Sequence, residues 1–77
     1  MGTIETQVLR STIKWAEKET WDAIRKSNAP ASIACEEFVR KMDEYSCRNK
    51  ATSVFFSIAK DVALSILDDI LIGGNRR

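Results

Sequence analysis

The stretch from Thr52 to Ile72 carries two adjacent rows of apolar side chains at helical spacing, and this pattern constrains the fold more than any other part of the chain. At about 100° per residue, the two rows lie side by side along one long helix. They consist of Phe55, Ala59, Val62, Ile66 and Ile70, and of Phe56, Ala63, Leu67 and Leu71. Because two apolar rows imply two packing neighbours, we expect this helix at the centre of the fold.

Two further helices are predicted upstream, over residues 3–27 and 30–48. The first repeats Leu9, Ile13, Ala16, Thr20, Ala23 and Ile24, with Ile4, Val8 and Trp15 widening its apolar face, and the second repeats Ala31, Ala34, Cys35, Phe38, Met42 and Tyr45. Pro30 marks the boundary because proline disfavours helical geometry at the preceding residue, and Asn28 suits a left-handed or capping conformation.

Capping residues set the bounds of the third helix. Asn49, Thr52 or Ser53 is expected to cap its start, and Gly73-Gly74 to end it, which leaves residues 73–77 as a tail. In the second helix, Glu36 and Arg40, Glu37 and Lys41, and Glu44 and Arg48 are spaced as stabilising ion pairs on a solvated face.

These patterns predict an all-α fold, a compact three-helix bundle in one domain of residues 1–77 with no strand. The expected core residues are Leu9, Ile13, Phe38, Met42, Phe55, Phe56, Val62, Ile66, Leu67 and Ile70. A chain of 77 residues buries only about 60% of its unfolded surface. Self-association or a partner would therefore add useful stability.

The sequence lacks the residues that most catalytic and metal sites need. It contains no histidine, so we expect no catalytic residue, no metal site and no cofactor. Cys35 falls on the apolar face of its helix and Cys47 on the opposite side. Their separation of about 18 Å along the helix excludes a disulfide between them, which favours free thiols in the cytoplasm.

Neither end of the chain indicates a membrane protein. The amino terminus lacks the apolar run of a secretory signal, and charged residues interrupt the third helix, so no membrane span is expected. Gly2 followed by Thr6 fits the pattern for myristoylation, although short patterns of this kind also arise by chance and Thr3 suits a helix cap.

One surface feature stands out on the first helix, where basic residues project to one side around a tryptophan. The residues are Arg10, Lys14, Lys18, Trp21 and Arg25. In one interpretation Trp21 folds over the edge of the bundle beneath Lys and Arg stems. In the other, the five residues form a binding patch, because exposed Trp and Arg are enriched at interfaces.

We therefore expect a small intracellular protein–protein interaction module or accessory subunit without catalytic activity. Its partner is another protein or a second copy, with a symmetric homodimer favoured. The apolar residues expected at the edges are Val54, Ile58, Leu64, Ile72, Ile33 and Trp21. The alternative is a nucleic-acid-binding accessory protein that uses the basic stripe. A net charge of +1 argues against sequence-specific binding of nucleic acid.

Overall fold

The chain folds into three α-helices in the computed structural model, which describes the backbone of residues 3–75 and the side chains of residues 6–73. The first helix, α1, spans Thr3–Lys26. Its buried face repeats every four residues, at Thr12, Ala16 and Thr20. Both threonine hydroxyls donate to the carbonyl four residues back, over 2.9 Å to Val8 and 2.7 Å to Ala16, which satisfies these buried polar groups. Gly2 and the side chain of Ile4 lie outside the described residues.

The end of α1 depends on Ser27 rather than on Asn28. The Ser27 amide donates to the carbonyls of Ala23 and Ile24, and its hydroxyl accepts from the Ala29 amide over 3.0 Å. Asn28 has a negative φ, so of the two conformations considered for it the left-handed one does not occur. A serine hydroxyl makes the turn without a strained backbone.

Helix α2 spans Ala31–Arg48, with Pro30 as its extended amino-terminal cap. Its buried residues are Ala34, Cys35, Phe38 and Met42, all of them expected on its apolar face. Of the three ion pairs predicted along α2, only Glu44 with Arg48 forms, at 3.5 Å. For exposed side chains, the conformational entropy lost in forming an ion pair often exceeds the electrostatic energy gained.

A short 3₁₀ turn, η1 (Lys50–Thr52), leads into α3, which spans Ser53–Asn75. Asn49, one of the residues expected to cap the third helix, caps this turn instead, by accepting the Ala51 amide over 2.9 Å. The prediction that Gly73-Gly74 ends the third helix and begins a tail is wrong, because α3 continues through both glycines. Glycine lowers helix propensity by about 1 kcal/mol but keeps the amide that the helix needs.

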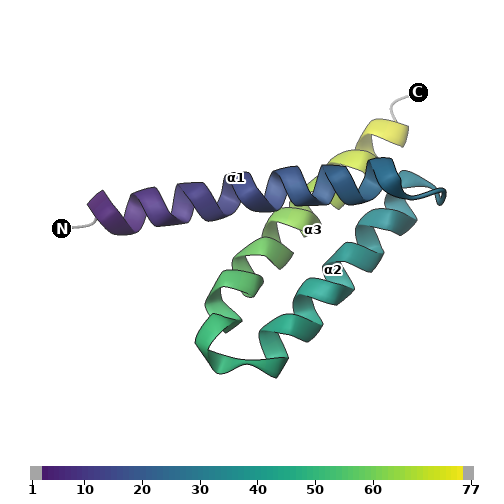
Figure 1. Cartoon of the computed structure of the whole chain (residues 1–77). Helices are drawn as coiled ribbons and strands as arrows, with labels where there is room; N and C mark the ends of the chain where they lie inside the picture. Colours follow the sequence, from purple (N-terminus) through teal and green to yellow (C-terminus); the bar gives the residue numbers. More distant parts are fainter. Residues whose placement is uncertain (1–2, 76–77) are drawn as a thin grey trace.

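The helices form an all-α three-helix bundle in which α2 and α3 make an antiparallel hairpin and α1 lies across it (Figure 1). Helix α3 packs against both other helices, which confirms its central position. Asp43 on α2 and Lys60 on α3 form an ion pair at 2.9 Å across the hairpin. The molecule measures 44 × 26 × 18 Å, and its long dimension follows α1, whose amino-terminal turns extend beyond the hairpin (Figure 1).

The core is built around small side chains where α1 crosses α3. Ala16, Ala59 and Ala63 are fully buried there, and Phe38 and Met42 of α2 complete the cluster. The Cys35 thiol donates to the Ala63 carbonyl over 3.2 Å. Alanine and threonine at this crossing let the helix backbones approach closely.

The predicted core is confirmed in part. Phe38, Met42 and Ile66 are buried, and Ile13, Phe56, Val62, Leu67 and Ile70 are half-buried. Leu9 and Phe55 were assigned wrongly, because their exposed fractions are 45% and 36%. Leu9 belongs to the stretch of α1 from residue 6 to residue 11, in which every residue is exposed.

Within residues 3–75, no helix is both long enough and apolar enough to cross a membrane.

Candidate functional site

Titratable side chains do not gather into a reactive site in the part of the chain that the structure describes. No group of three or more Cys, Asp or Glu residues there lies close enough to hold a metal ion. Burial, together with the negative charge of Glu36, raises the pKa of the Cys35 thiol, which makes it a poor nucleophile. Cys47 is exposed, as predicted.

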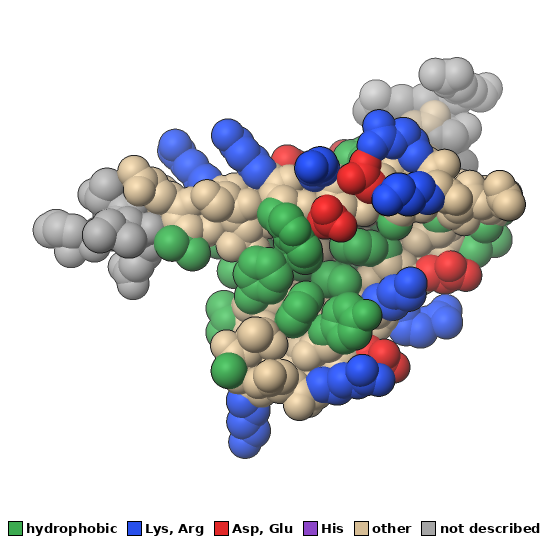
Figure 2. Space-filling model, viewed as in Figure 1, with side chains coloured by type: hydrophobic (Ala, Val, Ile, Leu, Met, Phe, Trp, Pro, Cys, Tyr) green, Lys and Arg blue, Asp and Glu red, His purple; other side chains and the backbone are tan. Residues whose placement is uncertain are grey.

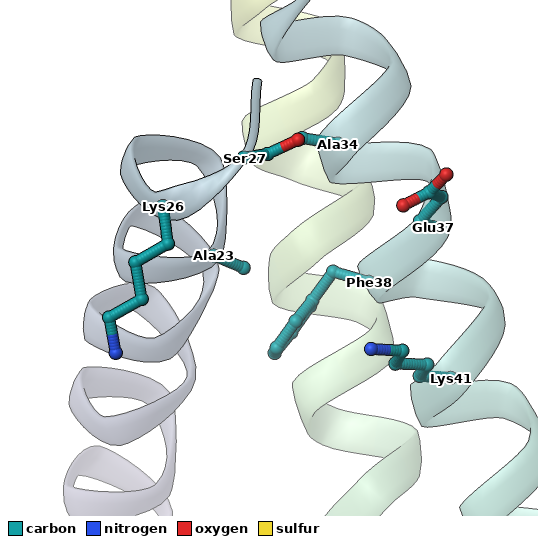
Figure 3. Close-up of a pocket in the computed structure, with 7 residues that line it drawn as sticks. All are labelled: Ala23, Lys26, Ser27, Ala34, Glu37, Phe38 and Lys41. Atoms are coloured by element: carbon teal, nitrogen blue, oxygen red, sulfur yellow. The ribbon is translucent and has the colours of Figure 1, made fainter. Parts of the chain in front are cut away.

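A small pocket of about 260 Å³ lies between α1 and α2. Its lining residues are Ala23, Lys26, Ser27, Ala34, Glu37, Phe38 and Lys41. Phe38 and Lys41 point from α2 towards α1, and Lys26 lies at the opposite rim (Figure 3). No buried side-chain nitrogen or oxygen among the described residues lacks a hydrogen-bond partner, so nothing in this pocket marks a ligand.

The most distinctive surface is a row of four aromatic rings that crosses all three helices. Trp15 of α1 packs against Phe55 of α3 at a centroid distance of 4.8 Å. Phe55 packs edge-on against Phe56 at 5.2 Å, and Phe56 against Tyr45 of α2, also at 5.2 Å. These separations are typical of favourable aromatic pairs. We call these four residues the aromatic row.

The rings of the aromatic row are in contact with one another but are not covered. The exposed fractions are 37% for Trp15, 36% for Phe55 and 37% for Tyr45, whereas Phe56 is half-buried. Figure 2 shows hydrophobic side chains gathered in the angle between α1 and the hairpin. Beyond Phe56 and Tyr45 the surface continues as an open groove of about 430 Å³, also lined by Arg48, Asn49 and Thr52.

Helix geometry explains why the row reaches every helix. Phe55 and Phe56 are successive residues of α3 and therefore point about 100° apart, one towards α1 and the other towards α2. Trp15 precedes the fully buried Ala16 by one residue, so it lies to the side of the crossing. The small residues fill the contact between α1 and α3, and the large aromatic rings lie at the edge of this contact.

The five residues predicted as an interaction patch all lie on the exposed side of α1. Arg10, Lys14, Lys18 and Arg25 are exposed, and Trp21 is 45% exposed. Arg25 pairs with Asp22, and Trp21 takes part in none of the aromatic contacts found among residues 6–73. Trp21 is therefore not part of the aromatic row, although Lys18 of the patch stands one helical turn after Trp15.

The predicted apolar edge residues do not form one patch. Val54, Leu64, Ile72 and Ile33 are exposed, whereas Ile58 is half-buried. Val54 and Ile72 lie near opposite ends of α3, about 27 Å apart along the helix. Val54 and Ile72 therefore belong to different parts of the surface.

Sequence reasoning missed the aromatic row because it assigned all four residues to apolar helix faces and placed both phenylalanines in the core. The adjacent pair Phe55-Phe56 was the available signal, since two successive helical residues do not face the same neighbour. Comparison with known proteins gives no match to a family model, a curated protein or a solved structure. Tyr, Trp and Phe, the residue types of the aromatic row, are enriched in the cores of protein interfaces.

Proposed function

We propose that this protein is a small interaction module without catalytic activity, and that the aromatic row is its protein-binding surface. The observation that carries the proposal is that Trp15, Phe55 and Tyr45 are each more than a third exposed and are joined, through Phe56, in one row of aromatic contacts. Tyr, Trp and Phe are enriched in the cores of protein interfaces, where a few such residues supply most of the binding energy.

The rest of the chain supports a binding role over catalysis. The sequence has no histidine, and the buried thiol of Cys35 has a raised pKa and points at the Ala63 carbonyl. The two cysteines are free, which suits a reducing compartment inside the cell. The partner in this proposal is another protein or a second copy of the chain.

Affinity capture with matched tryptophan variants tests the proposal. Trp15→Ser removes one end of the aromatic row, and Trp21→Ser removes a tryptophan of similar exposure from the far side of the same helix. We expect the wild type and Trp21→Ser to retain the same specific partner, or a second copy, and Trp15→Ser to lose it. Circular dichroism confirms that both variants stay helical. Equal capture by all three proteins would overturn the proposal.

Nucleic-acid binding is the second candidate function. It is favoured by Arg10, Lys14 and Lys18, which are exposed and form no ion pair with any side chain of residues 6–73. The balanced charge and the single small stripe argue for weak, salt-sensitive contact with phosphates only. In fluorescence anisotropy with mixed DNA duplexes, we expect no sequence-specific binding at physiological salt. Tight binding that survives a rise from about 50 to 200 mM salt would promote this candidate.

A further inference from the structure

We propose that the outer side of α1 binds the surface of a membrane that contains anionic phospholipids, with the helix lying along the plane of the headgroups. The residues are Arg10, Lys14, Lys18, Trp21 and Arg25, and we call them the basic face. This inference goes beyond the proposed function and does not depend on it. Three observations carry it: the distribution of charge on the molecule, the small extent to which the cations are paired, and the place of Trp21 among them.

The basic face collects positive charge on one side of α1. At about 100° per residue, its five residues fall within about 80° around the helix axis. Ala16, which is fully buried, lies about 160° from Lys14, so the basic face points away from the hairpin. Glu17 stands just outside this sector, and Glu19 and Asp22 lie further round the helix. Within the sector, every charged side chain is positive.

The hairpin behind α1 has the opposite charge. Helices α2 and α3, together with η1, carry seven acidic and five basic residues. A net charge near zero for the whole chain therefore does not describe its outer face. A negatively charged surface would orient the molecule with the basic face towards it and the hairpin away from it.

The cations of the basic face are largely unpaired. Arg10, Lys14 and Lys18 form no ion pair with any side chain of residues 6–73. Arg25 pairs with Asp22, but 76% of its side chain remains exposed. Each Lys or Arg close to an anionic bilayer increases the affinity about fivefold. The basic face thus offers enough free charge for binding that a net charge of +1 would not suggest.

A flat surface suits the shape of the basic face. Helix α1 runs straight (Figure 1), and Arg10 and Arg25 are about 22 Å apart along its axis. The long Lys and Arg side chains along this line can reach one plane together, and a bilayer presents its headgroups in a plane. The phosphates of a DNA duplex follow two spiral strands separated by grooves, so a straight row of cations meets them only where it crosses a strand. The arrangement therefore favours lipid headgroups over nucleic acid.

Trp21 adds an apolar group in the middle of the basic face. It follows Lys18 by three residues and precedes Arg25 by four, and its exposed fraction is 45%. Tryptophan is enriched where headgroups meet the hydrocarbon of a bilayer, because its ring is mostly apolar but carries a polar N–H group. Burial of apolar side chains together with attraction to anionic lipids is what holds helices at membrane surfaces.

Sedimentation with lipid vesicles tests the inference on the purified full chain. The probes are vesicles of phosphatidylcholine alone and vesicles in which about a third of the lipid is phosphatidylserine. In about 0.1 M salt we expect binding to the anionic vesicles only, and release when the salt is raised to about 1 M. No binding to the anionic vesicles, or equal binding to both kinds, would overturn the inference.

Two double variants with the same change in net charge test the site. Lys14→Gln/Lys18→Gln removes two cations of the basic face and should weaken binding to the anionic vesicles about twenty-five-fold. Lys41→Gln/Lys50→Gln removes two exposed lysines of the hairpin and should change it less than about twofold. Circular dichroism establishes that both variants remain helical. Equal losses would overturn the basic face as the binding site.

Single-tryptophan variants and a competitor identify the contact and the ligand. On addition of anionic vesicles, the Trp21 emission of Trp15→Phe should shift to shorter wavelength, and the Trp15 emission of Trp21→Phe should stay constant. A shift of Trp15 alone would place the aromatic row at the membrane and overturn the inference. We expect a mixed DNA duplex, at a phosphate concentration equal to that of the phosphatidylserine, to leave the protein on the vesicles. Displacement by the duplex would overturn lipid as the ligand in favour of nucleic acid.

Discussion

Two neighbouring regions of the molecule use apolar side chains in opposite ways. At the crossing of α1 and α3, the residues are small and fully covered, and the exposed fractions of Ala16, Ala59 and Ala63 are all 0%. In the aromatic row beside it, the side chains are large and Trp15 and Phe55 remain more than a third exposed. The buried contact sets how closely α1 and α3 approach. The rings at its edge leave apolar surface exposed, which only another molecule can cover.

The largest effect should come from comparing two phenylalanines that differ in burial. Phe38 is 9% exposed, so Phe38→Ala should destabilise the fold by about 3–5 kcal/mol. Phe55→Ala should cost only about 1–2 kcal/mol in the monomer, because much of that ring already contacts water. Urea denaturation at low protein concentration measures both. Equal losses would show that the aromatic row belongs to the core.

Overfilling the crossing should have the next largest effect. Ala63 is fully buried and its carbonyl accepts from the Cys35 thiol, so Ala63→Leu should destabilise the fold by about 1–3 kcal/mol. Ser65→Leu adds a similar side chain at an exposed position two residues later and should change stability by less than about 0.5 kcal/mol. A tolerated Ala63→Leu would mean that the helices do not approach closely there.

The two cysteines should show the same difference between a buried and an exposed position, with a smaller effect on stability. Cys47 is exposed and should react promptly with a thiol reagent in the native protein, whereas Cys35 should react only after the fold opens. The raised pKa of Cys35 keeps its thiol neutral in the folded state. Above the ordinary thiol pKa the unfolded chain loses this proton first, so the wild type should lose stability with rising pH more steeply than Cys35→Ala. Parallel pH profiles would contradict the buried position of Cys35.

Much of the fold could be predicted because helical periodicity is a local property of the sequence. The three helices, the central position of α3 and the buried face of α2 all follow from residue spacing, and Pro30 places the first boundary within a residue or two. Local patterns failed at Gly73, where the helix continues, because glycine at a helix end permits termination without requiring it.

The aromatic row could not be predicted because burial depends on where the helices cross. Phe55 and Ala59 belong to the same predicted row of α3, yet Phe55 is 36% exposed and Ala59 is fully buried. Leu9 and Ala16 show the same contrast on α1, where Leu9 is 45% exposed and Ala16 is fully buried. Spacing identifies the apolar face of a helix, but the tertiary crossing decides which part of that face a neighbour covers.

The fluorescence of single-tryptophan variants tests most directly the proposal that this protein associates with a partner through the aromatic row. In Trp21→Phe the emission comes only from Trp15, within the row, and in Trp15→Phe only from Trp21, on the outer side of α1. When the protein binds the partner proposed for the row, we expect the Trp15 emission to shift to shorter wavelength because its ring loses water, while the Trp21 emission stays constant. A shift of Trp21 alone, or of neither tryptophan, would contradict this account.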